Sequence, residues 1–439
     1  MSSNKIVHSA TVRLWGTRIG ALAWDERNDV AVFRYDPRFQ KSGIQVAPLI
    51  MPLRDEPYVF DNISKRTFSG LNGMVIDSLP DTYGNKIINQ WLAKNGRKPD
   101  SLNPVEKLCY IGQRGMGALE FDPSSRALET SEAFDVADLA QFANDIVNER
   151  EAFQTTLAAD QHDNLSDAIR VGTSGAGGAR AKALIAWHKE RNEVRSGQVK
   201  APEGFGYYLI KFDGISNNKD RDGVDPNDMT VVEYIYSLLC AEAGINMAHC
   251  ELLDDGSARH FVTERFDRDE RGNKVHFVSW CGLAHIDRDD VAAYSYEQLI
   301  MSMRELRLPQ VDIEQQFRRT VFNHFAVNFD DHSKNFGFLM NKRGQWSLSP
   351  AYDMTFSYDP SGRWTKSHQL TLNGKSAGHT LDDIHAFAQY CNVPKRRAET
   401  IIDEVRNAVA KFGDLAKEHK LDPVLADHII TCHKQFEPK

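Results

Sequence analysis

The chain has 439 residues, enough for roughly three domains, and its composition is 41% hydrophobic and 26% charged, which is typical of a globular protein and excludes a disordered or fibrous chain. The 53 Lys and Arg residues against 61 Asp and Glu residues give a net charge of −8, which excludes a general polyanion binder of the histone type but leaves room for a local basic patch.

The sequence predicts a cytoplasmic protein with no membrane contact. It has no run of 18 apolar residues, and its first residues lack the apolar core of a signal peptide. The cysteines are far apart, form no C-x-x-C pair and have no histidines at matching spacing, which argues against a structural zinc site. We expect six reduced and mostly buried thiols: Cys109, Cys240, Cys250, Cys281, Cys391 and Cys432.

The first part of the chain, residues 1–165, reads as an α/β module. Alternating apolar residues in 12–15, 21–24 and 30–33, separated by short turns, predict a small β-meander. After Pro80 the apolar spacing becomes helical. The residues that carry this helical pattern are Ile87, Ile88, Trp91, Leu139, Phe142, Ile146 and Val147.

The middle part, residues 166–270, reads as a mixed α/β lobe. A glycine-rich run at 172–181 leads into predicted strands at 182–187 and 207–212. A helix is predicted from about 231 to 243, with Thr230 and Glu233 spaced as a capping box at its start. A hairpin follows at 251–263.

The last part, residues 271–439, reads as mostly helical, so the predicted class is α+β. Amphipathic faces run through 313–325 and 401–412. Between them the chain reads as a helix that ends near Ala326, a polar loop at 328–335, a β-hairpin at 336–348 and an aspartate, Asp353.

The order of loop, hairpin and aspartate matches the needs of phosphoryl transfer. One aspartate accepts the proton of the attacking hydroxyl, an asparagine five residues later binds metal, and a second aspartate beyond a hairpin binds the metal that bridges the phosphates. Asp330, Asn335 and Asp353 have this order and spacing. His332 is unlike the residue at this place in protein kinases and resembles the loop of small-molecule phosphotransferases.

The loop pattern has simpler explanations when it is taken alone. Asp330, Asp331 and Asn335 could cap a helix and shape a turn, since short polar patterns recur by chance. A metal-dependent hydrolase that uses Asp330, Asp331, His332 and Asp353 is a further alternative, although it gives a glycine loop and a strand lysine no role.

The upstream half supplies the other parts of a kinase. Glycines in 172–178 expose backbone N–H groups that suit an anion, although the run matches no standard phosphate-loop motif and is equally compatible with a flexible loop. Lys211 lies in an apolar strand, where an unpaired ammonium is costly. Its candidate partners are an ATP phosphate and Glu233, for which the capping box is a competing but not exclusive role.

The assembled motifs resemble the HipA family of serine/threonine kinases, the toxins of HipBA-type toxin–antitoxin modules, over nearly the whole chain. Residues 115–121 and 79–84 resemble the family's first domain, and 178–182 its phosphate loop. The lysine strand at 210–212 and the adenine-contacting segment at 264–268 also have counterparts in the family. The most specific match is 328–335 together with 348–353. The resemblance implies a two-lobed, protein-kinase-like fold.

The resemblance also implies roles for individual residues, with ATP and Mg²⁺ as cofactors. Asp330 is expected to be the catalytic base, and His332 and Lys334 to help place the γ-phosphate. Asn335 and Asp353 are expected to ligate Mg²⁺. The residues expected to bind the nucleotide are Gly175, Gly177, Gly178, Ala179, Lys182, Lys211, Glu233, Glu264 and Phe266, the last two through their backbones.

The family phosphorylates aminoacyl-tRNA synthetases, is restrained by a DNA-binding antitoxin and is inhibited by its own phosphorylation. By resemblance we expect a protein substrate of this kind, a HipB-like antitoxin, operator DNA reached mainly through that antitoxin, and self-phosphorylation at Ser174 or Thr173. The unusually glycine-rich loop leaves the register of that site open. A small-molecule phosphotransferase and a catalytically silent corepressor are the alternatives within the same fold.

Overall fold

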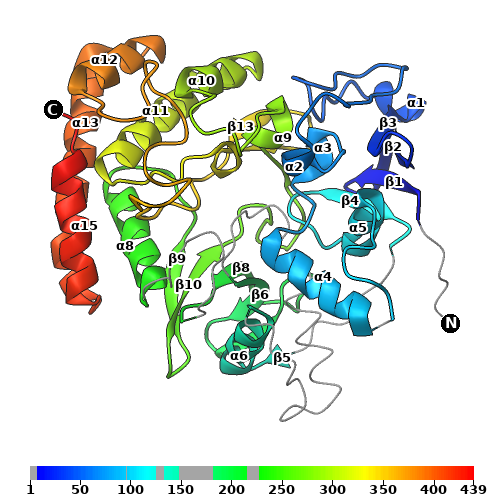
Figure 1. Ribbon diagram of the computed structural model, residues 1–439, viewed down its shortest axis with the longest axis horizontal. Helices are drawn as coiled ribbons and strands as arrows, with labels where there is room; N and C mark the ends of the chain where they lie inside the picture. The colour runs from blue at the N-terminus through cyan, green and yellow to red at the C-terminus, as the bar shows by residue number, and fades with distance from the viewer. Residues whose placement is uncertain (1–6, 95, 125–132, 148–180, 215–226) are drawn as a thin grey trace.

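The computed structural model describes residues 7–94, 96–124, 133–147, 181–214 and 227–439 (Figure 1). Three antiparallel sheets follow one another along this part of the chain, and helices dominate the last third. The first sheet lies at one end of the molecule and the C-terminal helix at the opposite end (Figure 1). The predicted α+β class is confirmed.

The first sheet has the strand order β3-β2-β1-β4 and contains the predicted meander. Its strands are β1 (Ser9–Leu14), β2 (Thr17–Asp25), β3 (Val30–Tyr35) and β4 (Leu119–Asp122). Trp15 and Gly16 join β1 to β2 with positive φ angles of 49° and 77°, the backbone that a two-residue hairpin turn requires. The helices between β3 and β4 are α1 (Pro37–Gln40), α2 (Lys65–Phe68), α3 (Gly73–Ile76), α4 (Thr82–Lys94) and α5 (Pro104–Ile111).

The middle sheet has the order β5-β7-β6-β8-β10-β9. Its strands are β5 (Ala133–Phe134), β6 (Lys182–His188), β7 (Glu193–Ser196), β8 (Gly206–Lys211), β9 (Cys250–Asp254) and β10 (Arg259–Glu264), and its helices are α6 (Val136–Val147) and α8 (Met229–Glu242). Both β5 and α6 precede residue 165, yet β5 pairs with β7, and Leu139 of α6 packs into the core beneath β6. Two elements on the N-terminal side of the predicted boundary near residue 165 thus pack with the middle sheet. The three-part division of the chain stays a prediction.

The last third contains the small sheet β11-β12-β13 and most of the helices. Its strands are β11 (His276–Ser279), β12 (Gly337–Met340) and β13 (Trp346–Leu348), and its helices are α9 (Trp280–Ala284), α10 (Tyr296–Glu305), α11 (Gln310–Phe325), the 3₁₀ turn η1 (Ser333–Asn335), α12 (Leu381–Tyr390), α13 (Lys395–Ala410), α14 (Phe412–Glu418) and α15 (Pro423–Phe436). The two predicted hairpins are confirmed as β9–β10 and β12–β13.

The start of α8 differs from the predicted capping box. The N-cap residue is Asp228, which has a φ of 68° and makes no side-chain capping bond. Thr230 lies inside the helix, after the N-cap, and its hydroxyl donates to the carbonyl of Arg259 at 2.7 Å. The capping box was wrong because Glu233 forms an ion pair with a lysine on the neighbouring strand β8 instead.

One continuous hydrophobic core joins the first sheet, α8 and the helices of the last third. At the junction α3 lies against α9 so closely that a Cβ added to Gly73 would lie 2.0 Å from the carbonyl oxygen of Gly282. Asp77 accepts hydrogen bonds from the backbone N–H and the hydroxyl of Ser279 at 2.6 and 2.8 Å. The N-terminal module is therefore built onto the last third.

The buried ring of His276 predicts acid sensitivity. Burial lowers its pKa to about 3, so the unfolded chain binds a proton first and stability falls as pH drops from 6.5 toward 3. Lowering the pH from 7.5 to 5.5 therefore reduces the free energy of unfolding by about 1.4 kcal/mol through this histidine. We expect the free energy of unfolding of His276→Gln, measured with urea, to fall by about 1.4 kcal/mol less than that of wild type over the same pH interval. Equal losses would contradict the assignment, and His8→Gln, at an exposed histidine, is the control.

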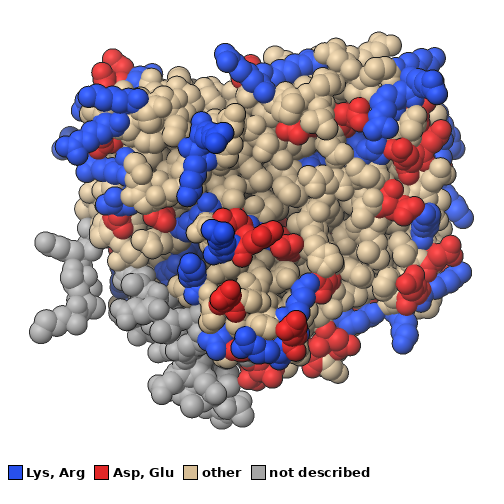
Figure 2. All heavy atoms as spheres, turned by 180° about the vertical axis from the view of Figure 1, so that it is seen from behind, with Lys and Arg blue, Asp and Glu red and all other residues tan. Residues whose placement is uncertain are grey.

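The surface carries charges of both signs. Lys and Arg side chains are interspersed with Asp and Glu on the face in Figure 2, in keeping with the net charge of −8. None of the helices described combines the length and the apolar character needed to cross a membrane. The six cysteines lie buried as free thiols.

Candidate active site

The polar loop after α11 is shaped around the backbone of Asp330. The chain leaves the helix through Val327, whose φ is 53°, and turns back in η1. The side-chain Nδ2 of Asn335 donates to the carbonyl of Asp330 at 2.7 Å. This bond fixes the amide, so that its Oδ1 faces away from the loop backbone and is left as an acceptor.

The carboxylate of Asp330 is held in place yet accessible. Its Oδ1 accepts a hydrogen bond of 2.7 Å from Nε2 of Gln369, a buried residue. The side chain of Asp330 is 42% exposed, and the ring of His332 lies 3.8 Å away. A half-exposed carboxylate with one oxygen fixed can accept a proton at the other.

Asp331, the next residue, is a structural group. It is buried, and it accepts hydrogen bonds of 2.7 Å each from the Tyr296 hydroxyl, from Nδ1 of His368 and from the backbone N–H of Gln369. Burial raises the pKa of Asp331 to about 6. These three bonds hold the buried carboxylate of Asp331 away from solvent, which disfavours the hydrolytic metal site considered above.

The loop and the hairpin bring Asp353 to Lys211. Nζ of Lys211 lies 2.5 Å from a carboxylate oxygen of Asp353 and 2.5 Å from one of Glu233 on α8. Burial opposes the charge on Lys211, but Asp353 and Glu233 together raise its pKa. Asp353 has a φ of 52°, an uncommon backbone conformation that often marks functional positions.

Lys182 stands beside Lys211 on the adjoining strand. The two residues are register partners in the antiparallel pair β6–β8. Nζ of Lys182 lies 3.2 Å from Oδ2 of Asp81, and both side chains are buried. Burial opposes ionisation of Asp353, but Lys211 and Lys182 lower its pKa. Two cations, Lys182 and Lys211, and three carboxylates therefore meet at this end of the middle sheet.

His332 and Lys334 have different surroundings within the loop. Nδ1 of His332 accepts from the backbone N–H of Lys334 at 3.2 Å, so a neutral ring carries its proton on Nε2, the nitrogen nearer Asp330. Burial lowers the pKa of His332, although Asp330 opposes this. Burial raises the pKa of Asp77, and the positive charge of Lys334 opposes this rise. The carbonyl of Lys334 accepts a hydrogen bond from the Tyr352 hydroxyl at 2.6 Å.

The end of β10 and the residues that follow it form one wall of a narrow cavity of about 50 Å³. The backbone N–H of Glu264 donates to the carbonyl of His249, so its carbonyl is the backbone group that it can offer to a ligand. Phe266 packs against Phe277 and Tyr352. The cavity is lined by Met116, Leu209, Lys211, Glu233, Met247, Phe261, Thr263, Glu264, Arg265, Phe266, Phe277, Tyr352 and Asp353.

A buried ion pair anchors this segment to the N-terminal module. Asp267 is fully buried and lies 2.8 Å from Arg265 and 2.8 Å from Arg268. It also accepts the backbone N–H of Gly117 at 2.8 Å. Burial opposes ionisation of Asp267, but the two arginines lower its pKa. The glycine-containing motif at 115–121 therefore fixes the connection between the two lobes.

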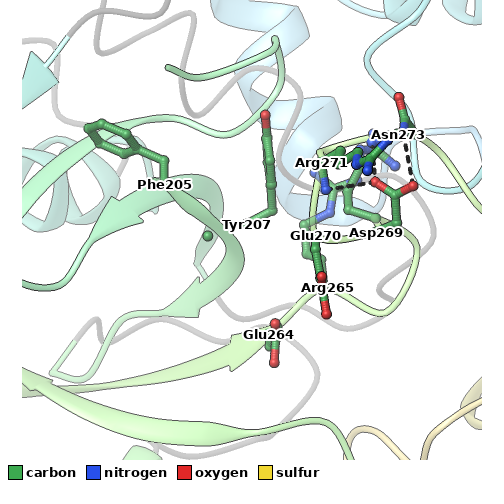
Figure 3. Close-up of a pocket in the computed structure, with 10 residues that line it drawn as sticks. Phe205, Tyr207, Glu264, Arg265, Asp269, Glu270, Arg271 and Asn273 are labelled. Atoms are coloured by element: carbon green, nitrogen blue, oxygen red, sulfur yellow. Dashed lines mark hydrogen bonds between the residues drawn. The ribbon is translucent and has the colours of Figure 1, made fainter. Parts of the chain in front are cut away.

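A larger cavity of about 510 Å³ lies on the outer side of the same segment. Figure 3 shows Phe205 and Tyr207 on one side of it and the turn from Asp269 to Asn273 on the other. The dashed lines mark bonds within that turn, where Asp269 accepts from Asn273 and Arg271. Neither the loop after α11 nor Asp353 lines this cavity, so it is separate from the residues expected to take part in catalysis.

The structure gathers part of the predicted site. It brings Lys211, Glu233 and Asp353 into direct contact and joins Asn335 to Asp330. The predicted phosphate-loop and self-phosphorylation residues lie outside the described residues: Thr173, Ser174, Gly175, Gly177, Gly178 and Ala179.

Three site residues were missed by sequence reasoning. Gln369 fixes Asp330, Asp81 pairs with Lys182, and Asp267 anchors the segment between the lobes. Asp81 and Asp267 lie within motifs that carry the family resemblance, so those motifs were their signal. Gln369 lies in an irregular segment between β13 and α12, where no periodicity pointed to it.

Two family models match the sequence. The model of the HipA-like C-terminal domain matches residues 174–412, and that of the HipA N-terminal domain matches residues 10–122. The first match alone covers more than half of the chain. The chain belongs to the HipA family. The predicted family is thereby confirmed.

Two curated relatives of this HipA-family chain are named as candidate kinases. Y4dM of Sinorhizobium fredii is 23% identical over 264 residues, which cover 56% of this chain and 61% of the relative. A protein of Haemophilus influenzae is 32% identical over 103 residues, which cover 21% of this chain and 29% of the relative. The chain thus spans less than two thirds of the length of either relative.

The fold is shared with a solved HipA structure. The chain aligns with HipA of Shewanella oneidensis, solved as a toxin–antitoxin complex of HipA, HipB and operator DNA, with a TM-score of 0.67 and 17% identity. The alignment covers 97% of this chain and 95% of that one. The predicted HipA-like two-lobed fold is confirmed.

Proposed function

We propose that this HipA-family protein is an ATP- and Mg²⁺-dependent protein serine/threonine kinase. The observation that carries the proposal is the position of Lys211, whose ammonium lies between Glu233 and Asp353 at 2.5 Å from each. A lysine paired with a helix glutamate and placed at the metal-binding aspartate is the arrangement that kinases use to hold nucleotide phosphates.

The residues at the site fit a magnesium ion. Mg²⁺ prefers oxygen ligands, and Asp353 and Asn335 offer a carboxylate and an amide oxygen. The bond from Asn335 to the Asp330 carbonyl leaves its Oδ1 as the acceptor. When bound, the ion would neutralise negative charge on the phosphates. Asp353 and Asn335 would hold it, and Lys211 would lie beside Asp353.

Asp330 would accept the proton of the attacking hydroxyl. It follows α11 in a largely buried loop from which its own side chain reaches solvent, and Gln369 fixes one of its oxygens while the other stays open. His332, with Nε2 toward Asp330, and Lys334 would help to place the γ-phosphate. Lys182 would stand with Lys211 at the phosphates, and the Glu264 carbonyl would meet the adenine.

For the substrate, the family resemblance supports a protein serine, with an aminoacyl-tRNA synthetase as the class. For partners, it supports a HipB-like DNA-binding antitoxin that links the protein to operator DNA. The similarity in fold to a HipA solved with HipB and operator DNA supports this choice. The net charge of −8 agrees with this, because an acidic protein is expected to bind DNA mainly through a partner.

The test is phosphate transfer from γ-labelled ATP and Mg²⁺ in a cell lysate, with mass spectrometry of the labelled protein. Label on a protein serine or threonine supports the proposal. Label on a metabolite instead would indicate a small-molecule phosphotransferase, and nucleotide binding without transfer would indicate a silent corepressor. Peptide mapping of the enzyme after long incubation tests self-phosphorylation at Ser174 or Thr173.

Gln369 gives a prediction about positioning. We expect Gln369→Leu to lower kcat about tenfold with little change in KM for ATP, because Asp330 loses the bond that fixes its rotamer. Gln369→Glu should lower kcat more, since it places a second carboxylate against Asp330. Steady-state kinetics check both variants. A change confined to KM for ATP would contradict the positioning role.

A further inference from the structure

Three histidines far apart in the sequence meet behind the catalytic loop. His324 lies on α11, and His368 and His379 lie in the irregular segment between β13 and α12. One ring nitrogen from each lies within 4.8 Å of those of the other two. The rings of His324 and His368 are stacked with centroids 4.1 Å apart, and that of His379 approaches His324 edge-on at 4.5 Å.

Each imidazole donates one N–H away from the cluster. Nδ1 of His324 lies 2.7 Å from the Thr320 carbonyl, and Nε2 of His379 lies 2.9 Å from the Lys375 carbonyl. A carbonyl only accepts, so those nitrogens carry the protons. Nδ1 of His368 donates in the same way to Asp331 at 2.7 Å.

The second nitrogen of each ring is therefore a lone-pair acceptor. Nε2 of His324 is buried and has no hydrogen-bond partner within the part of the chain that the structure describes. Burial lowers the pKa of all three histidines, which keeps the rings neutral near pH 7. Neutral imidazoles that donate one N–H to a carbonyl or a carboxylate are the usual ligands of transition metals.

The spacing and the surroundings suit a tetrahedral ion. Three nitrogens bound to one zinc at 2.0–2.1 Å lie about 3.4 Å apart, so the site closes when the rings, two of which are now stacked, rotate until their free nitrogens face one ion. The three histidines also line a cavity of about 310 Å³, which leaves room for a fourth ligand. Asp331 adds negative charge behind His368, whereas the charge of Lys375 is neutralised by Asp383 at 2.8 Å.

We propose that His324, His368 and His379 form a binding site for a divalent transition metal of the zinc class, with an open fourth position facing the cavity. Imidazole ligands and a tetrahedral geometry select Zn²⁺ over Mg²⁺ or Ca²⁺. The site is distinct from the magnesium site proposed at Asn335 and Asp353, and it does not depend on the proposed kinase function.

The proposed site is connected to the catalytic loop. His368 donates to Asp331, and the next residue, Gln369, donates its backbone N–H to Asp331 and its side chain to Asp330. A metal on His368 would therefore fix the segment that holds Asp330. This connection gives the site a role in positioning the loop.

The test is metal binding by the full-length, untagged chain after dialysis against a chelator. Titration with Zn²⁺ should show one ion per chain, and Co²⁺ should give the intense visible absorption of a tetrahedral complex. We expect His379→Gln to lower Zn²⁺ affinity more than tenfold and to abolish the tetrahedral Co²⁺ spectrum. His379 is the variant of choice because it is the least buried of the three and its replacement perturbs the core least.

His385→Gln, on nearby α12 but outside the cluster, is the matched control and should bind both metals as wild type does. Circular dichroism confirms that both variants fold. The proposal is overturned if the wild-type chain takes up no Zn²⁺, or if the His379 and His385 variants bind it equally well. A Co²⁺ spectrum of octahedral type in the wild-type chain would also overturn it.

Discussion

Asp330→Asn is expected to reduce phosphate transfer by about 10³-fold or more while leaving ATP affinity within about twofold, because the amide cannot accept the proton of the attacking hydroxyl. The substitution is nearly isosteric, and Gln369 can still donate to the remaining oxygen, so the loop keeps its shape. Transfer of γ-labelled phosphate gives the rate, and equilibrium binding of a fluorescent ATP analogue gives the affinity.

The control is Asp382→Asn, at an exposed aspartate in the first turn of α12. It should leave both quantities unchanged. Loss of nucleotide binding together with the fold in the Asp330 variant would show that Asp330 is structural instead. Unchanged transfer would remove it from the mechanism altogether.

Lys211→Ala should abolish phosphate transfer and also destabilise the protein by about 3–5 kcal/mol, since it leaves the buried carboxylate of Glu233 without its counter-charge. Asp353 is less affected, because it is partly exposed and Lys182 still acts on it. Urea unfolding measures the loss of stability. The double variant Lys211→Met with Glu233→Leu should regain most of the stability but none of the transfer.

Lys189→Ala is the matched control for the lysine. Lys189 follows β6 and pairs with Glu251 at the surface, with its side chain 44% exposed. An exposed pair contributes less than about 1 kcal/mol, so this variant should unfold close to wild type and remain active. A similar loss of stability in both lysine variants would show that burial of the Lys211 pair is not decisive.

Much of the fold was predictable because local patterns determine its elements. The meander, the two hairpins and the helix–loop–hairpin order ending at Asp353 all follow from short-range preferences, although the first turn, expected within 16–20, lies at Trp15 and Gly16 because residues 17–20 belong to β2. The partnership of Lys211 with Glu233 was one of two alternatives for Glu233. Tertiary packing decided between them, because the apolar strand around Lys211 makes an unpaired ammonium more costly than an uncapped helix.

The remaining part of the site depends on segments without periodicity. Gln369 and His368 lie between β13 and α12, where no regular element constrains their direction. The three clustered histidines are separated by 44 and 11 residues, so no metal-binding spacing links them in the sequence. The three histidines come together only when α11 meets that segment, so the spacing of the cysteines and of the histidines near them carries no sign of the cluster.

The close approach of Gly73 to Gly282 determines how the protein can be divided. The model of the N-terminal domain ends at residue 122. However, α3 and α9 meet in an interface, here called the seam, that has no room for even one added methyl group at Gly73. A fragment starting at residue 123 would present the apolar side of that seam to water and should aggregate when expressed alone. Co-expression with residues 1–122 as a separate polypeptide should restore a stable heterodimer, in which the missing peptide linkage is replaced by the contacts of the seam.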